Sequence, residues 1–324
     1  MKTVSVIIPV YNNEHYVEKC LRSVMEQTYP ALEILAIDDG SSDRSGEILE
    51  RLADEDSRIV LIRQENRGVG AARNAGLDRA TGTYLTFVDG DDYISPNYIR
   101  RYVRRIEQTK ADMIVGGLDF VTPEGKCVSR LTPDVYISTG REEWTMRVSG
   151  VWAHFYKRVI WEMPKIRFAE TKERGEDMPI ALYFAACAPK IDVLSASGYY
   201  YVQHPSSAMH NFRGLRTYQL PYETLRKAIR TIRQQGIRHG KDFHELFVLR
   251  ILATCCFDLA RGADKDKKKE LHAFIYEILE TWYPNYADNP YARLTTHANF
   301  PFAQRAAVWL LVKLAKHHML WLVP

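Results

Sequence analysis

Acidic residues gather at two places in this chain where an apolar run ends. Asp89-Gly90-Asp91-Asp92 follows the apolar run 84–88, and Asp38-Asp39 ends the run 34–37. An apolar run bounded by turn residues is typical of a buried strand. Clustered carboxylates repel one another, so they are tolerated where a cation, or a ligand carrying one, binds. Because Asp-Gly is also common turn chemistry, the first cluster alone fits an acidic turn equally well.

A third acidic pair, Glu176-Asp177, lies far downstream. The three acidic sites follow different strands or helices of the expected fold. This arrangement argues for one site assembled from several loops. Glu-Asp before an apolar helical stretch also suits the dipole of a helix N-terminus. The two interpretations are compatible, because a helix N-terminus is a rigid place for a general base.

The front of the chain alternates strand and helix patterns. Strands are predicted at 4–10, 33–37, 59–62, 84–88 and 112–116, with helices between them. This alternation predicts an α/β fold with a mostly parallel sheet and helices on both faces. Ligands of such sheets bind beyond the C-terminal strand ends. The acidic residues that fall at those ends are Asp38, Asp39, Asp89 and Asp91.

From about residue 214 the strand pattern gives way to helical spacing, so we expect one α/β domain over 1–213 and a helical region over 214–324. The tail 306–323 is apolar but carries Lys313 and Lys316, which argue against a membrane-spanning helix. Tryptophans beside basic residues fit an interfacial helix on anionic lipid. A helix docked on the rest of the protein fits the tail equally well.

The composition is that of a globular protein with a small basic excess, a formal net charge of +4. This excess is too small to indicate nucleic-acid binding. The five cysteines are scattered without metal-binding spacing, which favours a reducing cytoplasm over a disulfide framework. Lys2 leads directly into a strand broken by Pro9, so no signal peptide is expected. We expect a cytoplasmic protein, peripheral at the inner face of the cell membrane if the tail binds lipid.

Four ordered motifs resemble glycosyltransferase family 2. They are 4–13, 37–43, 66–76 and 87–92, and the similarity continues through 151–157, 175–178 and 199–204. Several motifs in order are far more specific than any one alone. The resemblance covers roughly residues 3–210 and implies a nucleotide-sugar-dependent, inverting enzyme with a GT-A fold.

The resemblance implies a donor site for a UDP-sugar. Its residues would be Pro9, Tyr11, Asp39, Gly68, Arg73 and Asp89. The backbone near Pro9 and Tyr11 would hold ribose and base, and the Asp39 carboxylate would accept a ring N–H of uracil. Asp89 would meet the ribose or the sugar. Arg73 would contact the nucleotide; the alternative is a solvent-facing helix arginine.

The resemblance also implies a divalent cofactor, Mn²⁺ or Mg²⁺, at Asp91. Such an ion neutralises the diphosphate leaving group, and hard ions prefer carboxylate oxygens. His204 falls where relatives carry a histidine or arginine near the metal, and imidazole can ligate Mn²⁺. This chain has Val202 where many relatives have an arginine, and His210 is a spare candidate.

On the acceptor side the resemblance implies that Asp177, beside Glu176, takes the proton of the attacking hydroxyl. Trp152 would stack on a sugar ring, with a core tryptophan as the alternative, and His154 departs from the usual residue at its position. The acceptor would be a glycan or a lipid-linked glycan. The function implied is sugar transfer in bacterial surface or capsular polysaccharide synthesis.

Other classes fit less well. Gly68-Val69-Gly70 superficially resembles a dinucleotide fingerprint, but Arg73 stands where the third glycine belongs. No phosphate-cradling Gly-Lys-Ser/Thr motif is present. A catalytically weak carbohydrate- or nucleotide-binding protein with the same fold is the remaining alternative. The presence of Asp39, Asp91 and Asp177 disfavours it.

Overall fold

The computed structural model of the protein describes residues 1–132, 150–162, 165–170, 175–204, 222–237, 241–260, 263–295 and 302–323. The chain divides into two compact units. The first comprises Met1–Ile137, Gly150–Lys172 and Ala188–Ser207, and the second Ser138–Ser149, Glu173–Cys187 and Ala208–Pro324. The domain boundary expected at 213 lies outside the described residues, as does His210.

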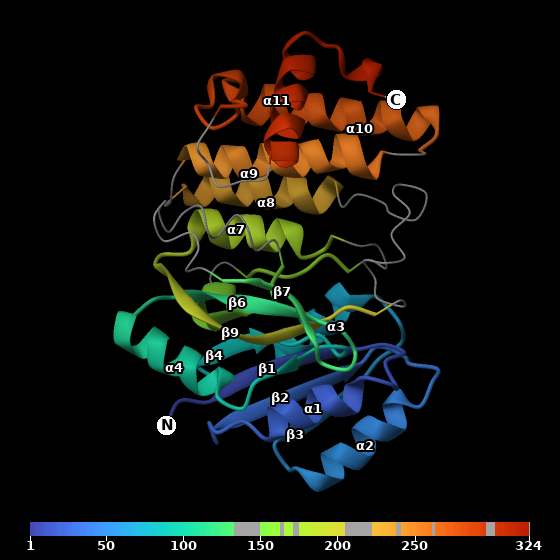
Figure 1. The fold of residues 1–324 in the computed structure, drawn as a ribbon, viewed down its shortest axis with the longest axis vertical. Helices are drawn as coiled ribbons and strands as arrows, with labels where there is room; N and C mark the ends of the chain where they lie inside the picture. The colour runs from blue at the N-terminus through green and yellow to red at the C-terminus, as the bar shows by residue number, and fades with distance from the viewer. Residues whose placement is uncertain are drawn as a thin grey trace. The chain divides into compact units, whose positions relative to one another are not determined.

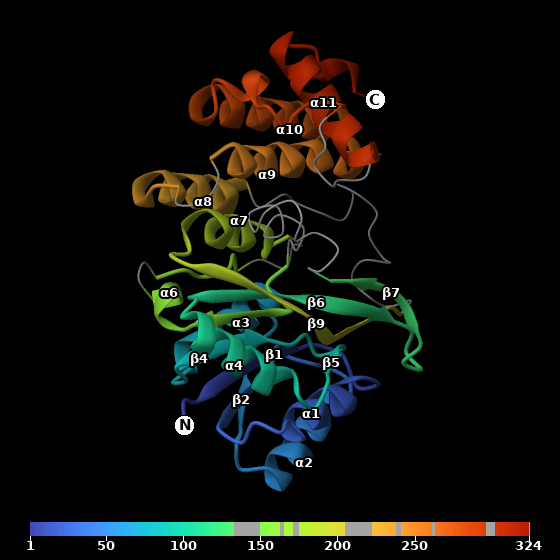
Figure 2. The same ribbon diagram turned by 60° about the vertical axis from the view of Figure 1, so that its left-hand side comes forward.

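The first unit is built on one mixed sheet (Figure 1). Its described strands are β1 (Val4–Val10), β2 (Leu32–Asp38), β3 (Ile59–Arg63), β4 (Tyr84–Phe87), β5 (Tyr93–Ile94), β6 (Met113–Val121), β7 (Cys127–Leu131), β8 (His154–Lys157) and β9 (Ile191–Val202). Their order is β3-β2-β1-β4-β8-β6-β9-β5, and β7 pairs with β6. Figure 2 shows β6 between β7 and β9.

The predicted parallel arrangement is present where the strand-helix alternation is regular. β3, β2, β1 and β4 are neighbouring parallel strands. The strand expected at 112–116 is present as β6, but β8 separates it from β4 and runs antiparallel to both. The sheet is therefore parallel in its first half and mixed beyond β4.

Helices cover both faces of β1. Val4, Val6, Ile8 and Val10 belong to a core with α1 (Val17–Met25), α2 (Ser45–Glu55) and α4 (Tyr98–Thr109). Ile7 points the other way, as strand alternation requires, and faces α3 (Val69–Arg79). A Cβ on Gly76 of α3 would lie 2.5 Å from the Ile7 side chain. The small residues of α3 therefore allow close packing on the sheet.

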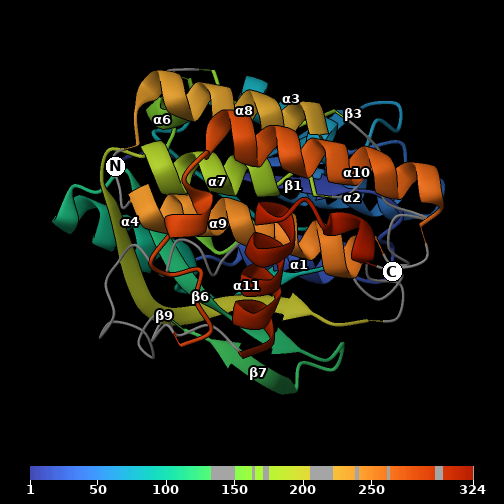
Figure 3. The ribbon, with the colours of Figure 1, turned by 90° about the horizontal axis from the view of Figure 1, so that it is seen from above.

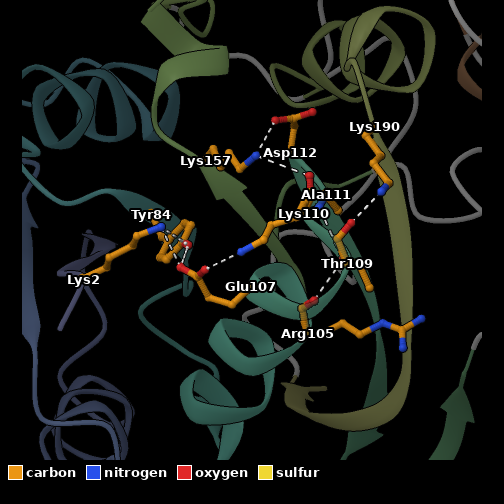
Figure 4. A network of polar contacts seen from close by, with 10 residues as sticks. All are labelled: Lys2, Tyr84, Arg105, Glu107, Thr109, Lys110, Ala111, Asp112, Lys157 and Lys190. Atoms are coloured by element: carbon orange, nitrogen blue, oxygen red, sulfur yellow. Dashed lines mark hydrogen bonds and ion pairs between the residues drawn. The ribbon is translucent and has the colours of Figure 1, made fainter.

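A polar network joins the C-terminal end of α4 to the residues where strands begin (Figure 4). The Lys2 ammonium lies 2.7 Å from Glu107, which also accepts a hydrogen bond from the Tyr84 hydroxyl. These two donors lower the pKa of Glu107 to about 2. Lys157 pairs with Asp112 at 2.8 Å. This network lies at the edge where β1 and β4 begin, so the opposite edge carries the acidic loops.

The second unit is helical. Its described elements are α7 (Met178–Cys187), α8 (Tyr222–Gln235), α9 (Lys241–Thr254), η3 (Cys255–Leu259), α10 (Lys265–Glu277), η4 (Ile278–Trp282), η5 (Tyr286–Asp288), α11 (Phe302–Lys316) and η6 (Leu320–Leu322). In Figures 1 to 3, α7 to α10 run with similar directions and α11 crosses them. Asp264 caps the N-terminus of α10, because its carboxylate accepts the Lys267 N–H at 2.8 Å. The helical region expected after 214 is thus present in the described residues.

The tail forms α11 and the short turn η6. Val308, Leu311, Val312 and Ala315 are buried, and α11 packs on α9. Of the two interpretations of the tail, a docked helix is therefore the one present in the structure. Within the described part of the chain, no helix has both the length and the apolar character needed to cross a membrane.

Candidate functional site

The loops that follow β1 and β2 are tied together at the C-terminal edge of the sheet. The Asn12 N–H donates to the Ser41 hydroxyl at 3.1 Å, and the Asn12 side-chain oxygen accepts the Ser42 N–H at 2.8 Å. Tyr11, at the head of this loop, is half exposed, whereas Pro9 lies within β1. A Cβ on Gly90 would lie 2.8 Å from the Pro9 carbonyl oxygen, so the loop after β4 also reaches this point.

Asp39 is buried and organises the loop that follows β3. Its Oδ1 accepts hydrogen bonds from the Gln64 amide at 2.7 Å and the Arg67 N–H at 3.0 Å. Its Oδ2 accepts the Gly68 N–H at 2.9 Å. Three of the roughly four lone pairs of the carboxylate are thereby used within the protein. Asp39 therefore has a structural role that the sequence did not reveal.

Gly68 and Gly70 shape the start of α3. Gly68 has φ +92°, a positive value that favours glycine. A Cβ on Gly70 would lie 2.1 Å from the Ala169 carbonyl oxygen, so only glycine allows this close approach. Asn74 exchanges two hydrogen bonds with the Phe168 backbone, at 2.8 and 3.0 Å. This motif thus fixes α3 against residues 168–169.

Arg73 and Asp89 form an ion pair. Arg73 is only 3% exposed, so the solvent-facing interpretation of this arginine is wrong. Its Nη2 lies 2.8 Å from Asp89 Oδ1, and its guanidinium lies over the Phe168 ring at 5.3 Å from the centroid. The Asp89 side chain keeps 22% exposure. The arginine therefore balances the charge of Asp89 and holds its carboxylate at the edge of the sheet.

Asp91 and His204 are brought together from positions more than a hundred residues apart. Asp91 Oδ2 lies 3.0 Å from His204 Nε2. The His204 ring is buried and stacks on Tyr16, with ring centroids 4.3 Å apart. The structure thus brings together the two residues named for the metal site, and Tyr16 is a partner of His204 that the sequence did not indicate.

The two side chains fit a divalent ion held jointly with a nucleotide. Neighbouring ligands of an octahedral ion at 2.0–2.1 Å lie about 3 Å apart, the spacing seen between Asp91 and His204. Among the residues that the structure describes, no group of three or more acidic, histidine or cysteine side chains could hold a metal. Mg²⁺ commonly takes only one or two carboxylates and completes its shell with phosphates and waters. The donor set therefore suits an ion that binds with the diphosphate.

Asp92, the third carboxylate of the cluster, turns inward. Its Oδ1 accepts the Val202 N–H at 2.8 Å, and its Oδ2 accepts the Tyr199 hydroxyl at 2.7 Å. Burial, together with Asp91 and Asp89, raises the pKa of Asp92 well above its ordinary value. Asp92 thus binds protein groups, and only Asp89 and Asp91 of the cluster keep part of their surface exposed.

Trp152 and His154 flank the start of β8. Trp152 is partly buried, and its ring centroid lies 5.7 Å from that of Tyr201. His154 is buried, and its Nδ1–H donates to the Trp152 carbonyl oxygen at 2.7 Å. Burial lowers the pKa of His154 to about 4. His154 is therefore neutral near pH 7 and supports the backbone beside Trp152.

Glu176 and Asp177 lie in the second unit, directly before α7. Gly175, with φ +90°, makes the turn that precedes them. The Asp177 carbonyl oxygen accepts the Ala181 N–H at 2.9 Å, so Asp177 lies at the helix N-terminus as predicted. Glu176 is buried and Asp177 is partly exposed.

The fold is that of the GT-A class. The structure of S. aureus TarS 1–349 in complex with UDP-GlcNAc matches over 98% of this chain and 92% of that chain, with a TM-score of 0.71 and 19% identity. Mannosyltransferase PcManGT from Pyrobaculum calidifontis, in complex with GDP-Man and Mn²⁺, matches over 99% of this chain and 87% of that chain, with a TM-score of 0.53 and 17% identity. At such identities the likeness shows the fold.

Sequence comparison adds the family. The model described as Glycosyl transferase family 2 matches residues 5–162. The uncharacterized glycosyltransferase EpsJ of Bacillus subtilis (strain 168) is 35% identical over 213 residues, which are 63% of this chain. The match spans 62% of that relative, less than two thirds of its length. The chain carries a glycosyltransferase family 2 domain, and the predicted family is confirmed.

Proposed function

We propose that this protein is an inverting glycosyltransferase that moves a hexose-type sugar from a UDP-sugar to a hydroxyl of a glycan or lipid-linked glycan. The observation that carries the proposal is the arrangement at the C-terminal edge of the sheet. There Asp39 lies beside Gly68, Arg73 pairs with Asp89, and Asp91 meets His204. These contacts hold the three carboxylates in defined positions, which supports a role for them in binding a nucleotide sugar.

On the donor side, Asp39 would read the base and Asp89 would bind the ribose or sugar. The remaining lone pair of the Asp39 carboxylate would accept the ring N–H of uracil. Arg73 orients the Asp89 carboxylate through the ion pair between them, 2.8 Å long. A hydrogen bond from a sugar hydroxyl to a pre-oriented carboxylate loses less entropy than one to a mobile side chain.

Asp91 and His204 would hold Mn²⁺ or Mg²⁺ together with the diphosphate. A divalent ion at this place supplies Lewis-acid neutralisation of the leaving nucleotide diphosphate. The protein contributes one carboxylate oxygen and one imidazole nitrogen, 3.0 Å apart. A neutral His204 is required for this, since only an unprotonated ring nitrogen can act as a ligand.

Asp177 would be the general base, with Glu176 beside it. Inversion requires the acceptor hydroxyl to attack the anomeric carbon from the side opposite the leaving group, and a base must take its proton. A carboxylate at the N-terminus of α7 is held rigidly and is stabilised by the helix dipole. Trp152, partly buried, would offer a ring face to the acceptor sugar.

The stereochemistry of the product tests the reaction. The protein is incubated with a panel of UDP- and GDP-sugars, Mn²⁺ and glycan acceptors, and the anomeric configuration of any product is determined by NMR. Inverted linkages from a UDP-sugar are expected. Retention of configuration, or strict use of GDP-sugars, would reject the corresponding part of the proposal.

We also propose peripheral contact with an anionic membrane, made by the turn after α11. Trp321 and Leu322 are 71% and 46% exposed, and Lys313 and Lys316 lie in the last turn of α11. Amphipathic tryptophan suits the membrane interface, and each lysine near an anionic surface contributes about 1 kcal/mol. The location would be the cytoplasmic face of the cell membrane.

Vesicle sedimentation tests this contact. Trp321→Ser should release the full-length chain from vesicles that contain anionic phospholipid, and binding of the wild type should weaken as salt rises. Phe302→Ser is the matched control, because Phe302 is an equally exposed apolar residue at the other end of α11. A wild-type chain that stays in the supernatant at low salt would reject the membrane contact.

A further inference from the structure

A pair of buried residues, Asp92 and Tyr199, connects the loop after β4 to the end of β9. The Asp89 N–H donates to the Tyr199 hydroxyl oxygen at 3.1 Å, and the Tyr199 O–H donates to Asp92 Oδ2 at 2.7 Å. Asp92 Oδ1 accepts the Val202 N–H at 2.8 Å. Both oxygens of Asp92 and both functions of the Tyr199 hydroxyl are thus used in one connected network.

The residues of this network are close neighbours of Asp91 and His204 in the sequence. Asp91 stands between Asp89 and Asp92, which both contact the network, and His204 follows Val202 by two residues. Pairing of β5 with β9, in which Tyr93 lies opposite Tyr200, joins the same two segments further on. Besides the direct contact between Asp91 and His204, contacts of their sequence neighbours therefore hold the two segments that carry them together.

Burial makes the network rigid. Asp92 is 2% exposed and Tyr199 is fully buried. Hydrogen bonds to a carboxylate that is shielded from water are stronger than those at a surface, and leaving one partner unsatisfied is costly. Partners one layer behind metal ligands typically change metal affinity by about 10–100-fold when they are removed.

We propose that Asp92 and Tyr199 are positioning residues that hold Asp91 and His204 at the spacing a divalent ion requires. The inference rests on the proposed function, because it assigns the ion to Asp91 and His204. It adds a role for the inward-facing third aspartate of the Asp-Gly-Asp-Asp motif and for a tyrosine outside the donor-binding motifs. Neither residue would touch the ion or the nucleotide.

Calorimetric titration with Mn²⁺ in the presence of saturating UDP is the measurement. Tyr199→Phe removes one hydroxyl and keeps the ring, so the Asp89 N–H and Asp92 Oδ2 each lose a partner. We expect Mn²⁺ to bind at least tenfold more weakly, while UDP without metal binds within about threefold of the wild type. Tyr200→Phe is the matched control, because the neighbouring side chain points to the other face of β9. It should leave Mn²⁺ affinity unchanged.

Asp92→Asn gives a second, independent variant. Its amide can accept only one of the two hydrogen bonds, so a comparable loss of Mn²⁺ affinity is expected. A thermal melt on each variant shows whether the unit is still folded, and Tyr199→Phe alone decides the matter if Asp92→Asn does not fold. Wild-type Mn²⁺ affinity in Tyr199→Phe would overturn the inference and leave the proposed function intact. A wild-type protein that binds no Mn²⁺ with UDP would overturn the metal role of Asp91, and this inference with it.

Discussion

Asp39→Asn separates the structural role of Asp39 from its proposed role in reading the base. The carboxylate is 2% exposed and accepts three hydrogen bonds, two of them from the main-chain N–H groups of Arg67 and Gly68. An asparagine keeps one oxygen. With that oxygen toward Gln64 and Arg67, its NH₂ group faces the Gly68 N–H, and two donors then oppose each other.

The expected loss of stability follows from the carboxylate oxygen that the substitution removes. A hydrogen bond to a charged group contributes about 1.5–3 kcal/mol, and a buried N–H left without a partner costs about 1–3 kcal/mol. We therefore expect Asp39→Asn to lower the free energy of unfolding by about 2–3 kcal/mol. In domains of this size 1 kcal/mol shifts the melting temperature by about 2–4 °C, so the expected decrease is about 5–10 °C.

The neighbouring Asp38→Asn is the matched control, since it removes the same charge one residue away. Asp38 Oδ1 accepts one main-chain bond, from Ser41 at 2.9 Å, and Oδ2 lies 3.8 Å from Arg63 Nε. An asparagine can keep the Ser41 bond, so a loss of about 1 kcal/mol or less is expected. Melting curves are recorded without nucleotide, and UDP affinity is measured by calorimetry. If Asp39→Asn melts like the wild type while UDP affinity falls, Asp39 acts only on the base and the structural role is wrong.

Three further predictions follow from the site. Asp91→Asn should reduce activity severely by weakening Mn²⁺ binding, and full activity of the wild type in EDTA would contradict this role. Asp177→Asn should abolish transfer and leave UDP affinity within a few-fold, since the base acts on the acceptor; a large loss of UDP affinity would move Asp177 to the donor site. Burial lowers the pKa of His154 to about 4, so this histidine binds a proton more readily in the unfolded protein than in the folded one. The free energy of unfolding should therefore fall by about 3 kcal/mol as the pH falls from about 6.5 to 4. His154→Gln should flatten that part of the profile in chemical denaturation, and an unchanged slope would contradict the assignment.

The first half of the sheet could be predicted because its signals are local. β1 and β2 are buried on both faces and read as continuous apolar runs, and helices of matching spacing separate them. The insertion of β8 could not be predicted in the same way. This strand has four residues, and its pairing of Thr86 with Phe155 joins segments far apart in the chain.

In the candidate site, too, contacts between residues far apart in the chain could not be predicted. Residue types predicted that Asp39, Asp89 and Asp91 lie at strand ends, and the structure has them in the loops that follow β2 and β4. Their partners were not predictable: Tyr199, which accepts the Asp89 N–H, lies 110 residues further along the chain, and nothing near either residue indicates the contact. Arg73 was ambiguous for a related reason: an arginine in a helix faces solvent unless a distant carboxylate pairs with it.

The charges of the Asp89–Asp92 cluster explain which carboxylate would be left for an ion. Asp89 is balanced by the buried guanidinium of Arg73, and Asp92 is surrounded by donors that belong to the protein. The ion-pair partner of Asp91 among the described residues is His204, which carries a charge only when protonated. On the proposed function, a divalent ion held by Asp91 and His204 would bring positive charge to this carboxylate. Arg73 balances Asp89 and protein donors surround Asp92, so under the proposed function Asp91 is the carboxylate that an ion bound with the nucleotide diphosphate would neutralise.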